Sequence, residues 1–258
     1  MKFNILGGDM RTCDPVTGAC GIGETASGLK QYEYVQKGSV NDVVIRYVGD
    51  PMCSWCWGIS PTVKNIEQYC AKENLNFLLT VGGLRAGGGD EWNSDFRSFL
   101  KNEWQHVASV TGQPFGFKIL EKPYFNYDTE FSCRAVVAVK SILNGQVGST
   151  QRALDFYARI QEKFYVEGDD PKEPSFYSSI CEGLGIDYKV FANKFKSDEI
   201  RISTEEDFAR ARSLGVRSFP TLLIELQGGV YALGSGFVTT DVILEKIEYF
   251  MSTKALNA

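Results

Sequence analysis

The feature that most constrains this chain is a pair of cysteines separated by two residues, Cys53 and Cys56, in the stretch VGDPMCSWCWGISP. The preceding residues 41–49 are β-branched and apolar enough for a buried strand, which Asp50 and the proline after it would end. After the pair, apolar residues recur at helical spacing to about residue 73. The pattern therefore predicts that Cys53 lies at the N-terminus of a helix that follows a strand.

A thiol at the start of a helix is expected to ionise easily. Unpaired N–H groups and the positive end of the helix dipole typically lower such a pKa from about 8.5 to roughly 3.5–7.5. The intervening residues, Ser54 and Trp55, carry no cation, so the helix terminus must supply most of the effect and only moderate oxidising power is expected. Because the thiolate is the attacking species in disulfide exchange, the pair predicts redox chemistry.

A cysteine pair with this spacing can also form half of a zinc site. The chain has one histidine, His106, and its other close pair, Cys13 and Cys20, is spaced too widely for a zinc knuckle. We therefore predict neither a metal nor a cofactor. A purely structural disulfide between Cys53 and Cys56 is disfavoured as well, because so short a loop constrains little of the unfolded chain.

Composition narrows the class of protein. The 258 residues suggest one core with a large insertion, or two domains, and 43% hydrophobic content with a net charge of -5 is ordinary for a globular protein. The sequence has no basic cluster, so we expect no nucleic-acid partner. It also has no apolar run of about 18 residues, so we expect no membrane span. The start of the chain lacks a secretory leader, so we expect a cytoplasmic protein. In a reducing compartment, Cys70, Cys133 and Cys181 are expected to be small core residues.

The remaining pattern predicts an α/β layout. A second buried strand over 75–81 leads into the glycine-rich segment 82–89, which lacks the spacings of phosphate-binding loops and is expected to be an exit loop. The segments with helical periodicity are 94–111, 129–143, 150–165, 174–184, 188–195 and 204–214. A strand over 220–226, a turn at 227–229, a strand over 230–233 and a helix over 239–253 close the chain.

This order of elements predicts a thioredoxin-like core with an inserted all-helical domain. We expect a leader at 1–40, a core built from 41–90 and 213–258, and an inserted domain at 91–212. Within the core, Pro220 directly precedes a strand. An X–Pro bond is the only peptide bond for which cis costs little, and the sequence alone leaves both isomers open.

The chain resembles the DsbA-like family of thioredoxin-fold thiol-disulfide oxidoreductases, and within it the cytoplasmic FrnE-like branch of predicted protein-disulfide isomerases. The resemblance covers about residues 43–251. It rests on four segments in the same order: DPMCSWCWG at 50–58, SCRAVVAVK at 132–140, FYVEGDDP at 164–171 and DFARARSLGVRSFPTLL at 207–223.

The resemblance implies a role for each residue of the site. Cys53 would be the attacking thiol, Cys56 the resolving thiol, and Pro220 a cis-proline that faces them. The backbone of Phe219 would pair with an extended substrate chain, which suits a broad range of substrates. Expected partners are protein or peptide thiols and disulfides, with glutathione or a thioredoxin-type protein as a source of electrons. The direction of electron flow depends on those partners.

Two further features are left open by the sequence. Met52 and Trp55 lie beside the thiols and are expected to offer an apolar contact surface to substrates, whereas Trp57 is as well explained by buried packing. Cys13 and Cys20 flank turn residues, so the chain could bring them together as a second redox pair, as a transient metal clip, or as a plain hairpin with incidental thiols.

Two rival functions fit the same fold. A non-redox adaptor that delivers a partner to a protease would have no need of the intact pair at Cys53 and Cys56. A glutathione-dependent transferase or isomerase of the kappa type normally uses a serine or a single cysteine at the helix start. The second thiol, Cys56, therefore argues against that rival.

Overall fold

The computed structural model describes residues 20–21, 43–226 and 229–256. Its centre is a four-stranded sheet in the order β3-β2-β5-β6. The strands are β2 (Val44–Gly49), β3 (Asn76–Val81), β5 (Thr221–Leu226) and β6 (Gly229–Ser235). β2 is parallel to β3 and antiparallel to β5, which is antiparallel to β6. A separate antiparallel pair joins β1 (Cys20–Gly21) to β4 (Ser218–Phe219).

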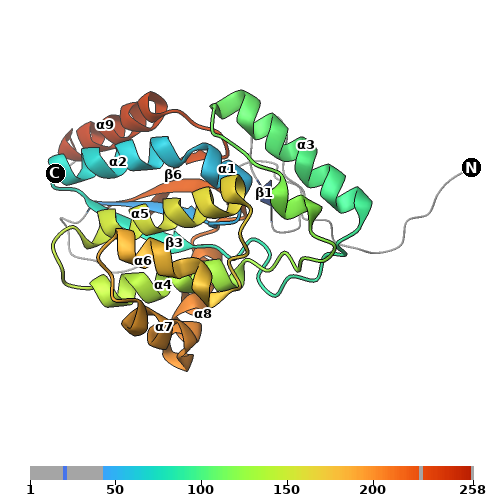
Figure 1. Cartoon of the computed structure of the whole chain (residues 1–258). Coiled ribbons are helices and arrows are strands. Elements are labelled where there is room, and N and C mark those ends of the chain that lie inside the picture. Colours follow the sequence, from blue (N-terminus) through green and yellow to red (C-terminus); the bar gives the residue numbers. More distant parts are fainter. Residues whose placement is uncertain (1–19, 22–42, 227–228, 257–258) are drawn as a thin grey trace, which may run out of the picture.

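Helices cover the sheet in two groups. α1 (Ser54–Gly58) and α2 (Ser60–Lys72) follow β2, and α2 packs beside the closing helix α9 (Thr240–Leu256), as Figure 1 shows. The other group comes between β3 and β4. It contains α3 (Ser94–Thr111), α4 (Glu130–Leu143), α5 (Ser149–Glu162), α6 (Ser178–Gly183), α7 (Tyr188–Lys196) and α8 (Asp198–Ser213). Short turns of helix lie at Lys118–Glu121, Lys163–Glu167 and Pro174–Tyr177.

Local signals explain where these helices begin and end. α3 has the predicted bounds because the Asn93 side chain accepts a hydrogen bond from the Phe96 N–H at 2.9 Å, and Gly112 ends the helix with φ +75°. The single helix predicted over 54–73 is instead broken at Ile59 into α1 and α2. The last helix of the insertion begins at Asp198 rather than at residue 204, because Ser197 caps it.

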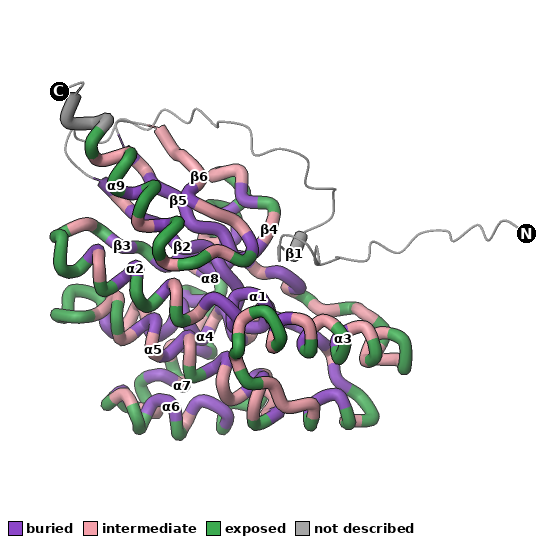
Figure 2. The backbone as a smooth tube through the Cα atoms, turned by 90° about the horizontal axis from the view of Figure 1, so that it is seen from above, coloured by how far each residue is buried: buried purple, intermediate pink, exposed green. Residues whose placement is uncertain are grey.

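Three buried clusters hold the molecule together. One lies between the sheet and the helices packed on it, a second surrounds the two cysteines of the pair, and the third is an aromatic cluster of Met52 and Trp57 with residues from 100 to 165. In Figure 2 the buried residues follow the central strands and the inner sides of the helices, while the outer turns of α3 and α9 are exposed. Phe164 lies within the aromatic cluster, with its ring 5.9 Å from Trp104 and 5.7 Å from Tyr127. These edge-to-face contacts tie α3 to the residues before α4.

The outer edge of β3 is closed by an ion pair rather than by another strand. The ammonium group of Lys140 on α4 donates to the Leu79 carbonyl at 2.7 Å and lies 2.8 Å from the Asp207 carboxylate on α8. The same carboxylate accepts a hydrogen bond from the Val81 N–H at 3.3 Å. No helix of the described residues is both long enough and apolar enough to cross a bilayer.

The aromatic cluster predicts a large stability cost for one substitution. Phe164 is fully buried, so Phe164→Ala should lower the free energy of unfolding by about 3–5 kcal/mol through lost contacts and a residual cavity. Tyr124→Ala, at a side chain that is 75% exposed, is the control and should change it by less than about 0.5 kcal/mol. Urea unfolding followed by circular dichroism measures both, and equal effects would contradict this account of the cluster.

Candidate active site

The two cysteines lie where β2 gives way to helix. Cys53 is the N-cap residue of α1, as predicted, and its N–H donates to the Asp50 carbonyl at 3.0 Å across the Pro51–Met52 turn. Cys56 follows one turn later and accepts a hydrogen bond from the Asp50 N–H at 3.5 Å. Both thiols are free, and both residues are fully buried.

Cys53 contacts the residue that precedes Pro220. The Phe219–Pro220 peptide bond is cis, which agrees with the isomer that the resemblance implies. The Cys53 thiol lies 3.7 Å from the Phe219 carbonyl oxygen, although the two residues are 166 positions apart in the chain. On its other side Phe219 pairs with Cys20 in the β1–β4 ladder. Residue 13 lies outside the described residues, so the predicted pairing of Cys13 with Cys20 has no structural description.

Burial affects the pKa of Cys53 more strongly than the helix terminus does. The predicted lowering of its pKa is wrong for this arrangement: burial, followed by the hydrogen bond that the Cys53 thiol donates to the Cys56 sulfur, raises the pKa of Cys53 well above its ordinary value. The cause is that α1 has only five residues and its N-terminus packs under Leu84, Val107 and Phe219 instead of facing water. In this closed arrangement Cys53 is a neutral thiol, so attack on a disulfide requires an opening that readmits water.

A buried carboxylate organises the loop that carries the pair. Asp50 has no exposed surface, and its side chain accepts hydrogen bonds from the Met52 N–H at 2.8 Å and the Leu84 N–H at 2.7 Å. The Cys133 thiol on α4 lies 3.4 Å from the same carboxylate. Burial raises the pKa of Asp50, and these hydrogen bonds oppose the rise only in part. The sequence predicted Asp50 only as the end of a strand.

Two tyrosines lie on the Cys56 side of the pair. The hydroxyl groups of Tyr47 on β2 and Tyr157 on α5 are 3.3 Å apart in the interior. Burial raises the pKa of Tyr47 well above its ordinary value, and the neighbouring Cys56 thiol raises it further. The two residues lie in the segments predicted as a strand over 41–49 and a helix over 150–165, and periodicity carries no signal for a contact between them.

Met52 and Trp55 differ from the expected contact surface, because each is only 1% exposed. Met52 packs in the aromatic cluster, where its carbonyl accepts a hydrogen bond from the Tyr127 hydroxyl at 2.8 Å. The Trp55 ring lies edge-on to His106 of α3, and its indole N–H has no hydrogen-bond partner in the described part of the chain. Packing of α3 and the residues after it over the motif removes both side chains from solvent.

The residues with a described placement contain no evident metal centre. Among them, no group of three or more His, Cys, Asp or Glu side chains is arranged to hold an ion. The other described thiols, of Cys70, Cys133 and Cys181, are buried in the core.

Comparison with known proteins identifies the family. A family model described as Thioredoxin matches residues 47–227, a span that includes the cysteine pair and Pro220. The chain belongs to this thioredoxin family. The match covers most of the sheet and all of the helices between β3 and β4.

Solved structures that resemble the chain include DsbA-like oxidoreductases. A candidate protein disulfide isomerase from Nitrosomonas europaea is 29% identical with a TM-score of 0.71, covering 83% of this chain and 99% of that one. The cytosolic disulfide reductase DsbM from Pseudomonas aeruginosa is 26% identical with a TM-score of 0.61, over 83% and 100% of the two chains. A second DsbM structure, which contains glutathione, is 24% identical over 81% and 99%, with a TM-score of 0.59. These likenesses confirm the predicted fold class and the DsbA-like resemblance.

A curated relative has a different role. The ClpXP adapter protein SpxH from Halalkalibacterium halodurans is 20% identical over 221 residues, which cover 82% of this chain. The chain spans 66% of the length of that relative.

The buried carboxylate predicts a pH-dependent difference in stability. Since the pKa of Asp50 is raised in the folded protein, the folded state keeps this proton at pH values where the unfolded chain, with a pKa of about 3.9, has lost it. The stability of the wild type relative to Asp50→Asn should therefore fall as pH rises from about 4 to the folded pKa, and stay constant above it. Urea unfolding at a series of pH values tests this, and a difference that is the same at every pH would contradict it.

A glycine next to Phe219 predicts a steric effect on the site. A Cβ atom at Gly82 would lie 2.1 Å from the Phe219 ring, so Gly82→Ala should displace this ring and cost about 1–3 kcal/mol. The displacement should also speed alkylation of Cys53 by iodoacetamide, measured by mass spectrometry. Gly183→Ala is the matched control, because no described atom lies within 4 Å of its added Cβ. Unchanged stability and alkylation in Gly82→Ala would count against this packing.

Proposed function

We propose that this chain is a thiol-disulfide oxidoreductase or isomerase that exchanges disulfides with protein substrates through Cys53 and Cys56. The observation that carries the proposal is the contact between the Cys53 thiol and the Phe219 carbonyl, beside the cis bond to Pro220. The likeness to solved disulfide oxidoreductases supports the general class of reaction.

The reaction divides between the two thiols. When the site opens, the Cys53 thiolate attacks one sulfur of a substrate disulfide, and the other substrate sulfur leaves as a thiolate. The Cys56 thiolate then attacks the Cys53 sulfur of the mixed disulfide, which releases the reduced substrate and leaves the pair oxidised. The same steps in reverse oxidise a substrate dithiol. The helix start of α1 stabilises the exposed thiolate only after the site has opened.

Phe219 and Pro220 are proposed to hold the substrate chain. An extended segment can add to the backbone of Phe219 as a short antiparallel strand, and this mode needs no particular substrate side chain. The ladder between β1 and β4 supports the proposal, because the chain's own residue Cys20 already pairs with Phe219 in this way. Met52 and Trp55 would contact a substrate only after the same opening.

The leader cysteines are proposed as a second redox pair that relays electrons to the first. In an antiparallel pair, residues directly opposite one another have Cα atoms about 4.5–5.5 Å apart. Cys20 is opposite Phe219, whose carbonyl contacts the Cys53 thiol, and this places the Cys20 backbone close to the attacking thiol. In the proposed relay, a disulfide between Cys13 and Cys20 would be attacked by Cys53 or formed at the expense of the oxidised pair.

Small thiols and a cytoplasmic location complete the proposal. The cytosolic reductase DsbM has been solved with glutathione, which supports glutathione or a thioredoxin-type protein as the electron donor here.

The chain is also proposed to divide into a leader at 1–40, a core of 41–90 and 213–258, and a helical insertion at 91–212. The position of α3 to α8 between β3 and β4 supports that division.

A second candidate is an adaptor without redox activity. The likeness to SpxH, an adapter of a protease, favours it. Such an adaptor would bind its partner through a surface, with no chemistry at the thiols. A pulldown of a partner that is the same with wild type and with Cys53→Ser would support the adaptor and weigh against the oxidoreductase.

The test of the main proposal is the redox titration of the pair. Wild type in glutathione buffers should show two cooperative dithiol couples. One couple should disappear in Cys53→Ser and the other in the double variant Cys13→Ser, Cys20→Ser, because each variant removes one pair. Thiol counts by mass spectrometry assign the couples.

The matched control is Cys70→Ala, which removes a buried thiol of α2 outside the pair and should keep both couples. Cys56→Ser should accumulate a mixed disulfide between Cys53 and a substrate, since no resolving thiol remains. Absence of any titratable couple at Cys53 and Cys56 would overturn the oxidoreductase proposal.

A further inference from the structure

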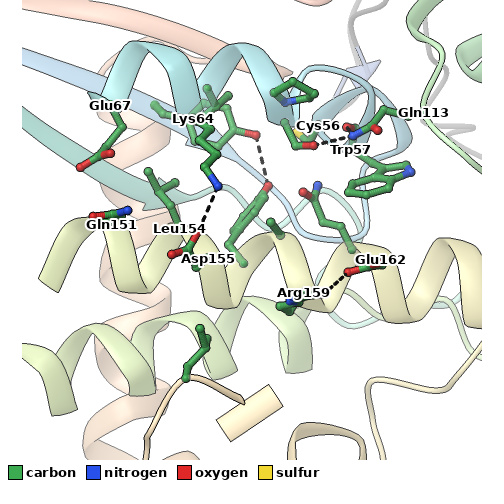
Figure 3. Close-up of a pocket in the computed structure, with 18 residues that line it drawn as sticks. Cys56, Trp57, Lys64, Glu67, Gln113, Gln151, Leu154, Asp155, Arg159 and Glu162 are labelled. Carbon is green, nitrogen blue, oxygen red and sulfur yellow. Dashed lines mark hydrogen bonds and ion pairs between the residues drawn. The ribbon is translucent and has the colours of Figure 1, made fainter. Parts of the chain in front are cut away.

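A cavity of about 510 Å³ lies between α2 and α5 and reaches the pair from the Cys56 side. Figure 3 shows Cys56 and Trp57 at one end of this space, with Lys64 of α2 facing Asp155 of α5 across it. The cavity opens to solvent, because the Lys64 side chain that lines it is 59% exposed. Cys53 is absent from the described residues that line the cavity. The space therefore leads from water toward Cys56 and not toward Cys53.

Two tyrosine hydroxyl groups form a hydrogen-bonded chain that begins at Cys56. The Tyr47 hydroxyl is hydrogen-bonded to the Cys56 sulfur, and it lies 3.3 Å from the Tyr157 hydroxyl. Both tyrosines line the cavity. The backbone leaves room for the two groups, because a Cβ atom at Gly49 would lie 2.5 Å from the Tyr47 oxygen and 2.8 Å from the Tyr157 oxygen. The chain of hydroxyl groups thus runs from the sulfur to the wall of the cavity.

The amide of Gln161 indicates where this chain can meet water. Gln161 follows Tyr157 by one turn of α5, so the two side chains lie on the same face of the helix, and both line the cavity. Gln161 has no exposed surface, and neither its amide nitrogen nor its amide oxygen has a hydrogen-bond partner among the described residues. Buried polar atoms in native proteins are normally paired with protein or with ordered water. Water bound at this amide would continue the chain from Tyr157 to solvent.

The Asp50 carboxylate is directed at other partners. Its oxygens accept hydrogen bonds from the Met52 N–H and the Leu84 N–H, and the Cys133 thiol lies 3.4 Å away. Toward Cys56, Asp50 presents its backbone N–H, 3.5 Å from the sulfur. An N–H group can stabilise a thiolate but cannot accept a proton, whereas a tyrosine hydroxyl both donates and accepts.

We propose that Tyr47 and Tyr157 carry the proton of Cys56 to the cavity when Cys56 resolves a mixed disulfide. The proposal rests on the proposed function, because it assigns two residues to the resolving step of that reaction. In the mixed disulfide the substrate occupies the Phe219 side of Cys53, so the cavity offers Cys56 a separate route to water. Tyr47 contacts the reacting sulfur and is a catalytic residue, whereas Tyr157 acts through Tyr47 and is a positioning residue.

The step balances in protons and electrons. The Cys56 thiol gives its proton to the Tyr47 oxygen, Tyr47 passes its own proton to Tyr157, and Tyr157 passes its own to water in the cavity. Tyr47 then donates to the thiolate and Tyr157 to Tyr47, an arrangement that stabilises the negative charge. The thiolate attacks the Cys53 sulfur, the bond from Cys53 to the substrate breaks, and the substrate sulfur leaves with the electron pair. That sulfur takes a proton from solvent, so no net proton is released.

Burial keeps both hydroxyl groups protonated, because it raises the pKa of Tyr47 and of Tyr157 well above the ordinary value. The titratable and charged groups that face the chain lie on the side of the pair and on the two helices of the cavity: Asp50, Cys53 and Cys56; Lys64 and Glu67 of α2; and Asp155, Arg159 and Glu162 of α5. Replacing a neutral hydroxyl by hydrogen leaves all of these charges in place. Phenylalanine variants therefore test the chain of hydroxyl groups alone.

The test separates attack from resolution in the full chain, with Cys13→Ser and Cys20→Ser in every sample. Reduced protein mixed with dithiobis(nitrobenzoate) should release thionitrobenzoate in two phases in a stopped-flow instrument. The first phase, attack by Cys53, depends on reagent concentration, and the second, resolution by Cys56, does not. At neutral pH, Tyr47→Phe should slow the second phase at least about tenfold, the factor expected when a hydrogen bond to a charged group is lost. The first phase should keep its rate.

The dependence on pH distinguishes proton transfer from a packing fault. The slowing in Tyr47→Phe should shrink as pH rises, because the thiol then loses its proton without the relay. Tyr157→Phe should slow the second phase about threefold or more, with the same dependence on pH. Tyr177→Phe is the matched control and should keep both phases. Tyr177 is fully buried, its hydroxyl donates to the Pro171 carbonyl at 2.6 Å, and it is not among the described residues that line the cavity.

A further variant tests the exit of the route. Gln161→Leu should slow the second phase in the same pH-dependent way, while its thermal unfolding midpoint stays equal to that of the parent or rises, since an apolar group replaces unpaired polar atoms. Parent rates in this variant would overturn the route through the cavity.

Three results at the tyrosines would overturn the inference. An unchanged second phase in Tyr47→Phe, a slowing that is equal at every pH, or the same slowing in Tyr177→Phe would each do so and leave the proposed function intact. Release of only one thionitrobenzoate by the pair would overturn the proposed function as well, because Cys56 would then not resolve the mixed disulfide.

Discussion

The Asp50 carboxylate is the contact on which the geometry of the site depends. It joins the turn before Cys53, the loop after β3 at Leu84, and α4 at Cys133, three segments that are far apart in the chain. The backbone of the same residue contacts both cysteines, through its carbonyl to the Cys53 N–H and through its N–H to the Cys56 sulfur. One buried residue thus fixes the helical insertion relative to the pair. Burying the Asp50 side chain away from water is energetically unfavourable, and this raises its pKa.

The structure gives the two thiols different surroundings. Both cysteines belong to one buried apolar cluster. Within it, Cys53 lies against Phe219, whereas Cys56 lies near the hydroxyl groups of Tyr47 and Tyr157. The difference arises because Phe219 comes from the segment before β5, whereas Tyr157 comes from α5.

Local sequence signals predicted the elements that local chemistry controls. Helical periodicity over 94–111 marked α3 correctly, and the apolar run before Asp50 marked β2. The break at Ile59 was missed because periodicity continues through it. The burial of Cys53, Met52 and Trp55 could not be predicted, because it depends on packing by residues of the insertion and of the Phe219 segment. Gln161 gave no signal either, since an isolated glutamine in a helix is usually an exposed residue.

The closed edge of β3 limits how other polypeptide chains can associate with the sheet. An edge strand with free N–H and C=O groups is a template on which another chain can extend the sheet. Here Lys140 occupies the Leu79 carbonyl and Asp207 the Val81 N–H, and α4 and α8 hold both side chains in place. The insertion therefore also shields the core from intermolecular β-association at this edge.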